Sequence, residues 1–139
     1  MPSLFLLHEK LPTDLQKVNL FVERVAQKIL SAVGNEKIVF DVKLALEEVL
    51  TNAMRHGNAL DPSLKVDVSI ELYREKIIMD VRDEGKGFDF QNLPDPTDET
   101  NVNKPSGRGV FLMRRVMDEV EFYGGGCGVK LTKFFPACL

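Results

Sequence analysis

The chain contains no tryptophan, only two cysteines and no long hydrophobic run. Cys127 and Cys138 are too few for a disulfide framework, so free thiols in a reducing cytosol are the simpler interpretation. The net charge of −3 lacks the basic excess typical of nucleic-acid binding, so we expect no direct contact with nucleic acid. The opening sequence MPSLFLLHEK has a four-residue apolar run and no basic leader, which predicts neither a signal peptide nor a membrane span. We therefore expect a cytoplasmic protein without a membrane anchor.

The composition that is present is ordinary for a globular protein. Hydrophobic residues make up 44% of the 139 positions and charged residues 28%. A chain of this length can bury one substantial core, and no internal repeat divides it. We expect residues 1–139 to form a single domain.

The stretch 41–58, DVKLALEEVLTNAMRHGN, is the most informative part of the chain. Its apolar residues recur at three- and four-residue steps, which predicts an amphipathic helix capped by Asn35. Glu48, Asn52 and His56 follow one another at four-residue steps and form a stripe at the edge of the apolar face. A carboxylate and an amide at a core edge are costly unless they are used, although on this helix alone a solvated flank is the simpler interpretation.

Other patterns predict a helix before this stretch and a hairpin after it. A short strand is predicted over 3–8, and Thr13 followed by Gln16 has the spacing of a capping box, which predicts a helix from there to Gly34. Residues 64–73 and 77–82 alternate apolar with polar side chains and predict two paired strands. Two closing strands are predicted over 119–123 and 128–135.

Asp83 continues the inward phase of the second hairpin strand, and an acid on the core side of a strand end needs a partner. The alternative is that the strand ends at Arg82 and Asp83 lies in a turn. Gly85 and Gly87 follow in DEGKGF, where alternate glycines let the backbone approach a ligand closely. D-x-G-x-G alone is a weak signal, because Asp-Gly turns are common.

Residues 89–106 contain three prolines and no period, and a structureless connection of this length is usually functional or mobile. It is followed by Gly107, Arg108 and Gly109, which open a predicted helix beginning with Val110. A glycine-rich entry to a helix presents free N–H groups and the positive end of the helix dipole, which suits phosphate.

In this order, the segments EEVLTNAMRHGN, VRDEGKGFD and SGRGVFLMRRVMDEVEF resemble the Bergerat-fold (GHKL) nucleotide-binding superfamily. The layout is most similar to the anti-sigma serine-protein kinases of bacterial partner-switching systems, and the resemblance extends from about Leu4 to Phe135. It implies an α/β sandwich with a single mixed, mostly antiparallel sheet and helices on one face, and ATP bound between sheet, second helix and a lid formed by 89–106.

The resemblance also implies a role for each site residue. Asn52 would hold Mg²⁺ through its amide oxygen, an atom suited to that cation, and Glu48 would act as general base toward a serine or threonine hydroxyl. Asp83 would accept a hydrogen bond from the adenine amino group. The residues expected to surround the nucleotide from the two glycine motifs are Gly85, Gly87, Gly107, Arg108, Gly109 and Val110.

Two positions depart from the family pattern. Pro105 and Ser106 stand where relatives often carry an arginine before the second glycine motif, so Arg108 or Lys104 would supply the charge. Gly126-Cys127 stands where a Gly-Thr pair often supports the adenine contact, and a thiol is a weaker hydrogen-bond donor than a hydroxyl.

Three functions follow from the resemblance. The first is an ATP–Mg²⁺-dependent kinase that sequesters a sigma factor, phosphorylates a small antagonist protein and forms a homodimer. The second is an ATP-binding interaction module of the same fold with little or no transfer. The third, a sensor-histidine-kinase domain, ranks last because the sequence shows no helical hairpin carrying a phospho-accepting histidine, and His8 and His56 lie in the wrong contexts.

Overall fold

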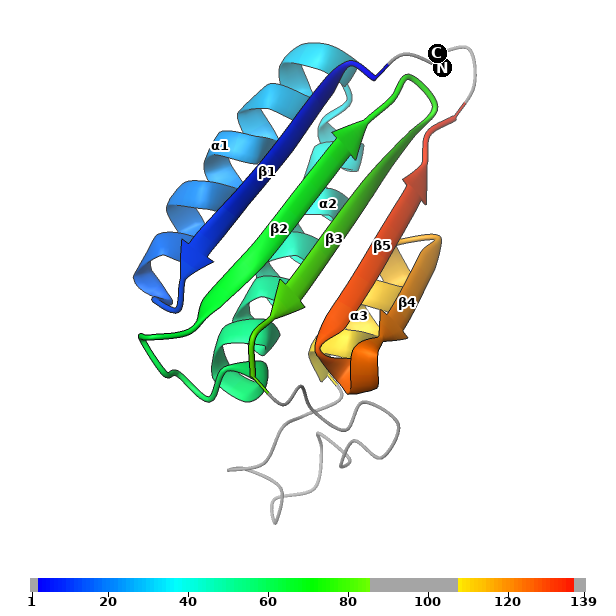
Figure 1. The fold of residues 1–139 in the computed structure, drawn as a ribbon. Coiled ribbons are helices and arrows are strands. Elements are labelled where there is room, and N and C mark those ends of the chain that lie inside the picture. The colour runs from blue at the N-terminus through cyan, green and yellow to red at the C-terminus, as the bar shows by residue number, and fades with distance from the viewer. Residues whose placement is uncertain (1–2, 86–107, 137–139) are drawn as a thin grey trace.

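Five strands and three helices form two layers in the computed structural model, which describes residues 3–85 and 108–136, the side chain of Arg108 excepted (Figure 1). In chain order the elements are β1 (Phe5–Pro12), α1 (Gln16–Val33), α2 (Glu36–Asn52), the π-helical turn η1 (Ala53–Gly57), β2 (Lys65–Leu72), β3 (Lys76–Asp83), α3 (Arg108–Val116), β4 (Glu119–Tyr123), the 3₁₀ turn η3 (Gly124–Gly126) and β5 (Gly128–Phe134). The strands follow the order β1-β2-β3-β5-β4, and all four neighbouring pairs are antiparallel. This arrangement confirms the predicted α/β sandwich.

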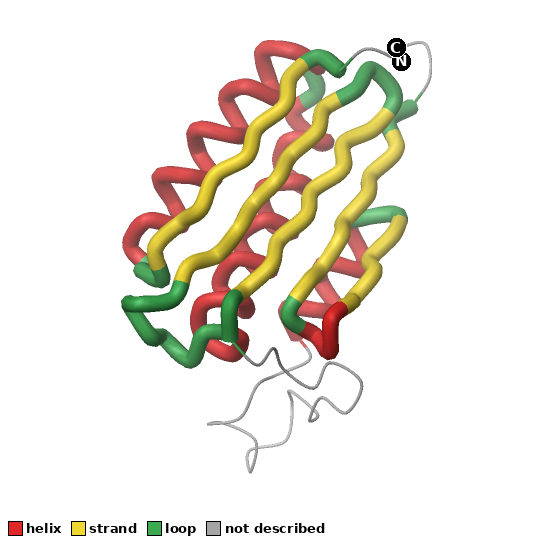
Figure 2. Tube along the Cα trace, in the orientation of Figure 1, coloured by secondary structure: helices red, strands yellow, loops and turns green. Residues whose placement is uncertain are grey.

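The core lies between the sheet and the three helices, which cover the same face (Figure 2). Alternate residues of β2 and β3 point into it because strand side chains alternate between faces. The buried residues of these two strands are Val66, Val68, Ile70, Leu72, Ile77, Met79 and Val81. They pack against the apolar stripes of α1 and α2, so α2, the helix with the candidate site, lies over the middle of the sheet.

The beginning of the chain differs from the sequence prediction in two respects. The first strand extends to Pro12 because β1 pairs with β2 along its whole length, as far as Lys65. The capping box is wrong: α1 begins at Gln16 without a side-chain cap, and the Thr13 hydroxyl donates instead to the Leu64 carbonyl oxygen at 2.6 Å. The predicted end at Gly34 is confirmed, with φ of +68°.

The long central helix is also not a single α-helix to its end. Asn35 caps α2 as predicted, accepting a hydrogen bond from the Ile38 N–H. After Asn52 the backbone widens into η1, which the Asn58 N–H closes by donating to the Ala53 carbonyl over five residues, at 2.8 Å. This wider turn breaks the four-residue spacing of the predicted stripe before His56.

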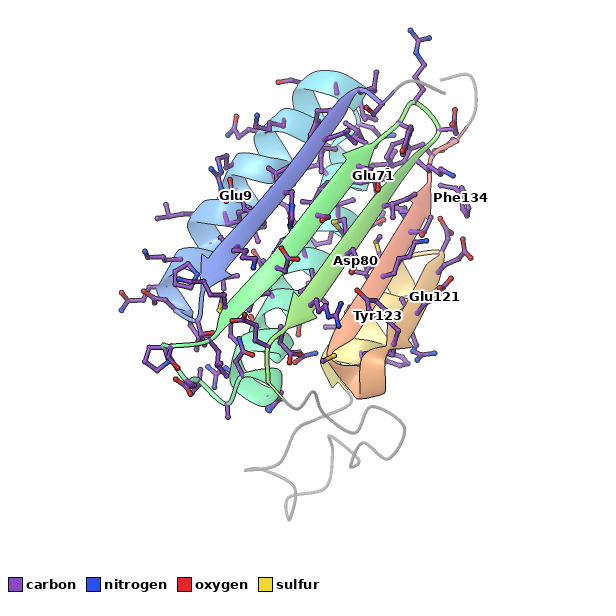
Figure 3. All side chains as sticks on the ribbon, in the orientation of Figure 1. Glu9, Glu71, Asp80, Glu121, Tyr123 and Phe134 are labelled. Carbon is purple, nitrogen blue, oxygen red and sulfur yellow. The ribbon has the colours of Figure 1, made fainter. Side chains whose placement is uncertain are left out.

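The uncovered face of the sheet carries mostly polar side chains, among them Glu71, Asp80 and Tyr123 (Figure 3). The Tyr123 hydroxyl donates to the Asp80 carboxylate, although their strands β4 and β3 are separated by β5. Burial, and then the hydrogen bond to Asp80, raises the pKa of Tyr123 to about 12. Among the described residues, no helix covers this face.

A charged cluster joins the layers near the start of α2. The Asp41 carboxylate is buried and accepts from Lys37 at 2.6 Å and lies 3.3 Å from the Lys133 ammonium of β5. Lys133 also donates to the carbonyl oxygen of Val116, the last residue of α3, at 2.8 Å. One buried acid therefore links α2, β5 and the end of α3.

Candidate functional site

Glu48 and Asn52 lie one turn apart on α2 and face the beginning of α3. The two helices pack together, and Gly109 of α3 comes closest to both side chains. A Cβ at Gly109 would lie 2.5 Å from Glu48 Oε2 and 3.4 Å from Asn52 Nδ2. Glycine therefore lets α3 approach Glu48 and Asn52 without displacing the Glu48 carboxylate. The structure places Glu48 and Asn52 of α2 beside Gly109 at the start of α3.

The amide of Asn52 has an unsatisfied donor. Its Nδ2 atom is buried and has no hydrogen-bond partner within the described part of the chain. A buried donor without a partner costs about 1–3 kcal/mol, so the group calls for an explanation such as a bound water, ion or ligand. A ligand with an acceptor oxygen, such as a phosphate, would satisfy this group.

The carboxyl of Glu48 is shifted toward its protonated form. Burial, and second the negative charge of Glu47, raises the pKa of Glu48 above its usual value. A carboxylate with a raised pKa is a stronger base when it is ionised. Burial, and second the positive charge of Arg55, lowers the pKa of the His56 ring below its usual value, which favours its neutral form.

Asp83 is the last residue of β3, and its side chain is buried with only 5% of its surface exposed. The predicted inward orientation is therefore correct, and the alternative of a strand ending at Arg82 is wrong. Its Oδ1 accepts the Gly85 N–H at 3.0 Å. A Cβ at Gly57 would overlap the Asp83 carboxylate, and one at Gly85 would overlap the Gly57 carbonyl oxygen. The turn after β3 thus lies directly on η1.

Asn52 and Asp83 open onto one small cavity between α2, α3 and the sheet. It has a volume of about 10 Å³, which is room for roughly one water molecule. Its walls are formed by Val49, Asn52, Ala53, Val81, Asp83, Met113, Phe122, Gly126, Cys127 and Val129. The acceptor predicted for adenine and the amide predicted for the metal therefore share one apolar-walled space, which must widen to admit a nucleobase.

A wider hollow of about 410 Å³ lies across the sheet from this cavity, at the ends of β2 and β3. It is lined by Lys10, Lys65, Asp67, Arg82, Asp83, Glu84, Gly85 and Cys127. Acids and bases are present in equal number, so their charges give no preference for an anion. The small cavity combines apolar walls with the amide of Asn52, as ligand sites do, but its volume must increase before it can hold a nucleotide.

Cys127 pairs with Asp83 through its backbone. The Cys127 carbonyl oxygen accepts the Asp83 N–H at 2.8 Å, while the thiol donates to the Gly124 carbonyl oxygen at 3.0 Å. The strand-to-strand contact is thus independent of the side chain at this position. The departure at Cys127 changes a wall of the cavity and leaves the backbone pairing intact.

Several predicted site residues cannot be placed. Val110 is described, and it is buried at the start of α3. Arg108 begins α3, but its side chain is outside the described part. Gly87, Gly107 and the predicted lid over 89–106 also lie outside the described residues.

Two residues near the site were underrated from the sequence. Gly57 reads as an ordinary helix end, yet the Asp83 carboxylate occupies the place of its missing side chain. Asn58 is 1% exposed and hydrogen-bonds to three other segments of the chain. In the sequence, Gly57 and Asn58 are distinguished only by their short distance along the chain from Asn52. That distance gives no information about contacts with β2 or β3.

A magnesium ion would find few protein ligands here. Among the described residues no three acidic, histidine or cysteine side chains cluster as a metal site. Mg²⁺ commonly uses one or two protein oxygens together with phosphates and water, so a single Asn52 oxygen fits that pattern. The site thus suits a metal that arrives with a phosphorylated ligand.

No helix within residues 3–85 and 108–136 is long and apolar enough to cross a membrane.

Comparison with known proteins identifies relatives of the chain. Serine-protein kinase RsbW of Bacillus subtilis (strain 168) is 34% identical to the chain over 101 residues, covering 68% of this chain and 63% of that protein. RsbW of Bacillus cereus (strain ATCC 10987 / NRS 248) is 30% identical, with 68% and 62% covered. The alignments thus span less than two thirds of the length of these two relatives. RsbW of Staphylococcus epidermidis is 25% identical over 133 residues, covering 90% of this chain and 84% of that protein.

The fold has a solved counterpart as well. The crystal structure of the RsbU and RsbW domains of Rv1364c from Mycobacterium tuberculosis matches with a TM-score of 0.62 at 17% identity, covering 96% of this chain and 34% of that one. Residues 9–133 match the family described as the histidine kinase-like ATPase domain. Since that match covers most of the chain, the protein belongs to the histidine kinase-like ATPase domain family.

Proposed function

We propose that the protein is a serine/threonine-protein kinase that binds ATP with Mg²⁺, phosphorylates a small antagonist protein and sequesters a sigma factor. The observation that carries the proposal is the buried, unsatisfied amide of Asn52 beside Glu48, under the glycine that opens α3. Its relatives named serine-protein kinase RsbW support the same reaction type. The partners and a homodimeric state follow from the family resemblance alone.

In this proposal Asn52 holds the phosphates in two ways. Its amide oxygen would bind Mg²⁺, and its Nδ2, which has no partner among the described residues, would donate to a phosphate oxygen. Bound Mg²⁺ would neutralise charge that develops on the transferring phosphoryl group. Glycines at the entry to α3 let backbone N–H groups approach the same phosphates. Phosphoryl transfer depends mostly on positioning and charge neutralisation of this kind.

Glu48 acts on the attacking hydroxyl. The hydroxyl oxygen of the antagonist's serine or threonine forms a bond to the γ-phosphorus, the bond to the bridging oxygen breaks, and ADP leaves. Glu48 accepts the hydroxyl proton, and its raised pKa strengthens it as a base. Asp83 selects adenine by accepting from its amino group, which guanine lacks at that position.

The test begins with affinity capture of the antagonist protein from the native cell on the purified chain. Transfer of labelled phosphate to this captured antagonist, measured beside a nucleotide titration, tests the proposal. Glu48→Gln should retain nucleotide affinity and lose transfer by roughly 10²–10⁴-fold. Asn52→Ala should lose both. Glu47→Gln is the matched control, because it makes the same chemical change one residue away; it should lower the pKa of Glu48 but leaves the Glu48 carboxylate in place. Wild-type transfer by Glu48→Gln would remove Glu48 as the base.

A second candidate is an ATP-binding module that regulates partner affinity without transfer. It is favoured by Cys127, whose thiol is occupied by the Gly124 carbonyl and offers no hydroxyl to support the Asp83 contact. If the wild-type chain binds ATP and a sigma factor but transfers no phosphate to the captured antagonist, this second function replaces the first.

A further inference from the structure

Asn58 lies beneath the turn that carries Asp83, and it contacts three segments distant in sequence. The residue is 1% exposed. Its Nδ2 donates to Thr13 Oγ1 at 2.9 Å and to the Lys65 carbonyl oxygen at 3.1 Å, and its Oδ1 accepts the Glu84 N–H at 2.9 Å. The side chain therefore joins the entry to α1, the start of β2 and the turn after β3.

The turn after β3 is fixed by three successive backbone N–H groups. The Asp83 N–H donates to the Cys127 carbonyl, and the Gly85 N–H donates to the Asp83 carboxylate itself. Between them, the Glu84 N–H donates to Asn58. The first bond ties the turn to the end of η3 and the second is local, so Asn58 supplies the side-chain bond that ties the turn to the end of η1.

The partners of Asn58 are themselves held in place. Thr13 Oγ1, which accepts from Asn58, donates to the Leu64 carbonyl at 2.6 Å, and the Asn58 N–H closes η1 by donating to Ala53. The Glu84 side chain also accepts the Lys65 N–H at 2.5 Å. A buried polar network in which the members are paired has one preferred arrangement, and it is costly to disturb.

We propose that Asn58 is a positioning residue that sets the orientation of the Asp83 carboxylate for base recognition. The inference rests on the proposed function, because it requires Asp83 to read adenine. Asn58 touches no nucleotide in this scheme. It acts by holding the Glu84 N–H, which fixes the chain on the C-terminal side of Asp83 while Gly57 packs against the carboxylate itself.

The test is calorimetric affinity for non-hydrolysable ATP and GTP analogues with Mg²⁺, measured on folded protein. Asn58→Ala should weaken ATP-analogue binding about tenfold, the size of roughly one hydrogen bond, and leave GTP-analogue binding nearly unchanged. The ratio of the ATP-analogue affinity to the GTP-analogue affinity is the informative quantity, because a general loss of folded protein would lower both apparent affinities together. Asn35→Ala is the matched control. It removes the hydrogen bond that another asparagine accepts from the Ile38 N–H at the start of α2, far from Asp83, and should preserve both affinities.

Asn58→Asp provides a second variant that separates positioning from stability. It keeps an oxygen for the Glu84 N–H and loses the two donors to Thr13 and Lys65, so it should melt at a lower temperature than wild type yet retain the ATP preference. An unchanged preference in Asn58→Ala, a lost preference in Asn58→Asp, or an equal loss in Asn35→Ala would overturn the inference. If wild type binds neither analogue, the proposed function itself fails, and the role of Asn58 in base recognition falls with it.

Discussion

Replacing Gly109 by alanine is the most direct test of the gap between α2 and α3. The new Cβ would lie 2.5 Å from Glu48 Oε2, whereas ordinary contact begins near 3.4 Å, so the carboxylate must move by about 0.9 Å. A displacement of about 1 Å in a reacting group can cost about 10²-fold in rate. We therefore expect Gly109→Ala to lower phosphate transfer by about two orders of magnitude.

The stability of Gly109→Ala should be equal to that of wild type or slightly higher, although its transfer activity falls. Alanine is favoured over glycine by up to about 1 kcal/mol inside a helix, and the Glu48 side chain can rotate aside. The variant should therefore unfold at the same temperature as wild type or higher, while its rate of single-turnover transfer of labelled phosphate falls. Loss of activity through unfolding would contradict the expectation.

The double variant Glu48→Ala with Gly109→Ala supplies the control for the steric cause. Removing the Glu48 carboxylate gives the new methyl group room, so any nucleotide affinity lost in Gly109→Ala should return, although transfer should not. Neighbouring residues that share a contact are expected to couple in this way. Wild-type transfer by Gly109→Ala, or no recovery of affinity in the double variant, would refute the geometry.

Three further predictions concern charged residues. Because burial raises the pKa of folded Glu48, its ionisation opposes folding; Glu48→Gln should therefore melt above wild type at pH 8, and the gap should close as the pH falls through the raised pKa. Asp83→Asn should lose about 1.5–3 kcal/mol of ATP binding by calorimetry, and equal affinities would remove Asp83 from this role. Asp41→Ala removes the buried acid paired with Lys133 and should cost about 2–4 kcal/mol in urea unfolding, with nucleotide affinity intact because the cluster joins β5 to the far end of α3.

Much of the architecture was predictable because its signals are local. The alternation in β2 and β3 and the helical spacing in α1 and α2 report which side of each element is buried, whatever it packs against. The inward phase of Asp83 followed from the same alternation, and its 5% exposure agrees. The end of α1 at Gly34 needed only the preference of glycine for positive φ.

The errors in the fold arose where a distant segment decided the outcome. Thr13 has the local chemistry of a helix cap, but its hydroxyl instead donates to the Leu64 carbonyl and accepts from the Asn58 amide. The first strand reaches Pro12 because β2 is available as a partner, and no local property of residues 9–12 announces that pairing. Both cases reflect tertiary hydrogen bonds that override local preference.

For the candidate site, the sequence by itself determined which chemical groups are present and their order along α2, β3 and α3. Only the tertiary structure decided that the donor of Asn52 is buried with no partner among the described residues, that Gly109 lies against Glu48, and that Asn58 lies under the Asp83 turn. These properties depend on how closely separate elements pack. Periodicity gives the direction of a side chain but not the distance to its neighbours across the fold, and that distance sets burial, pKa and hydrogen bonding.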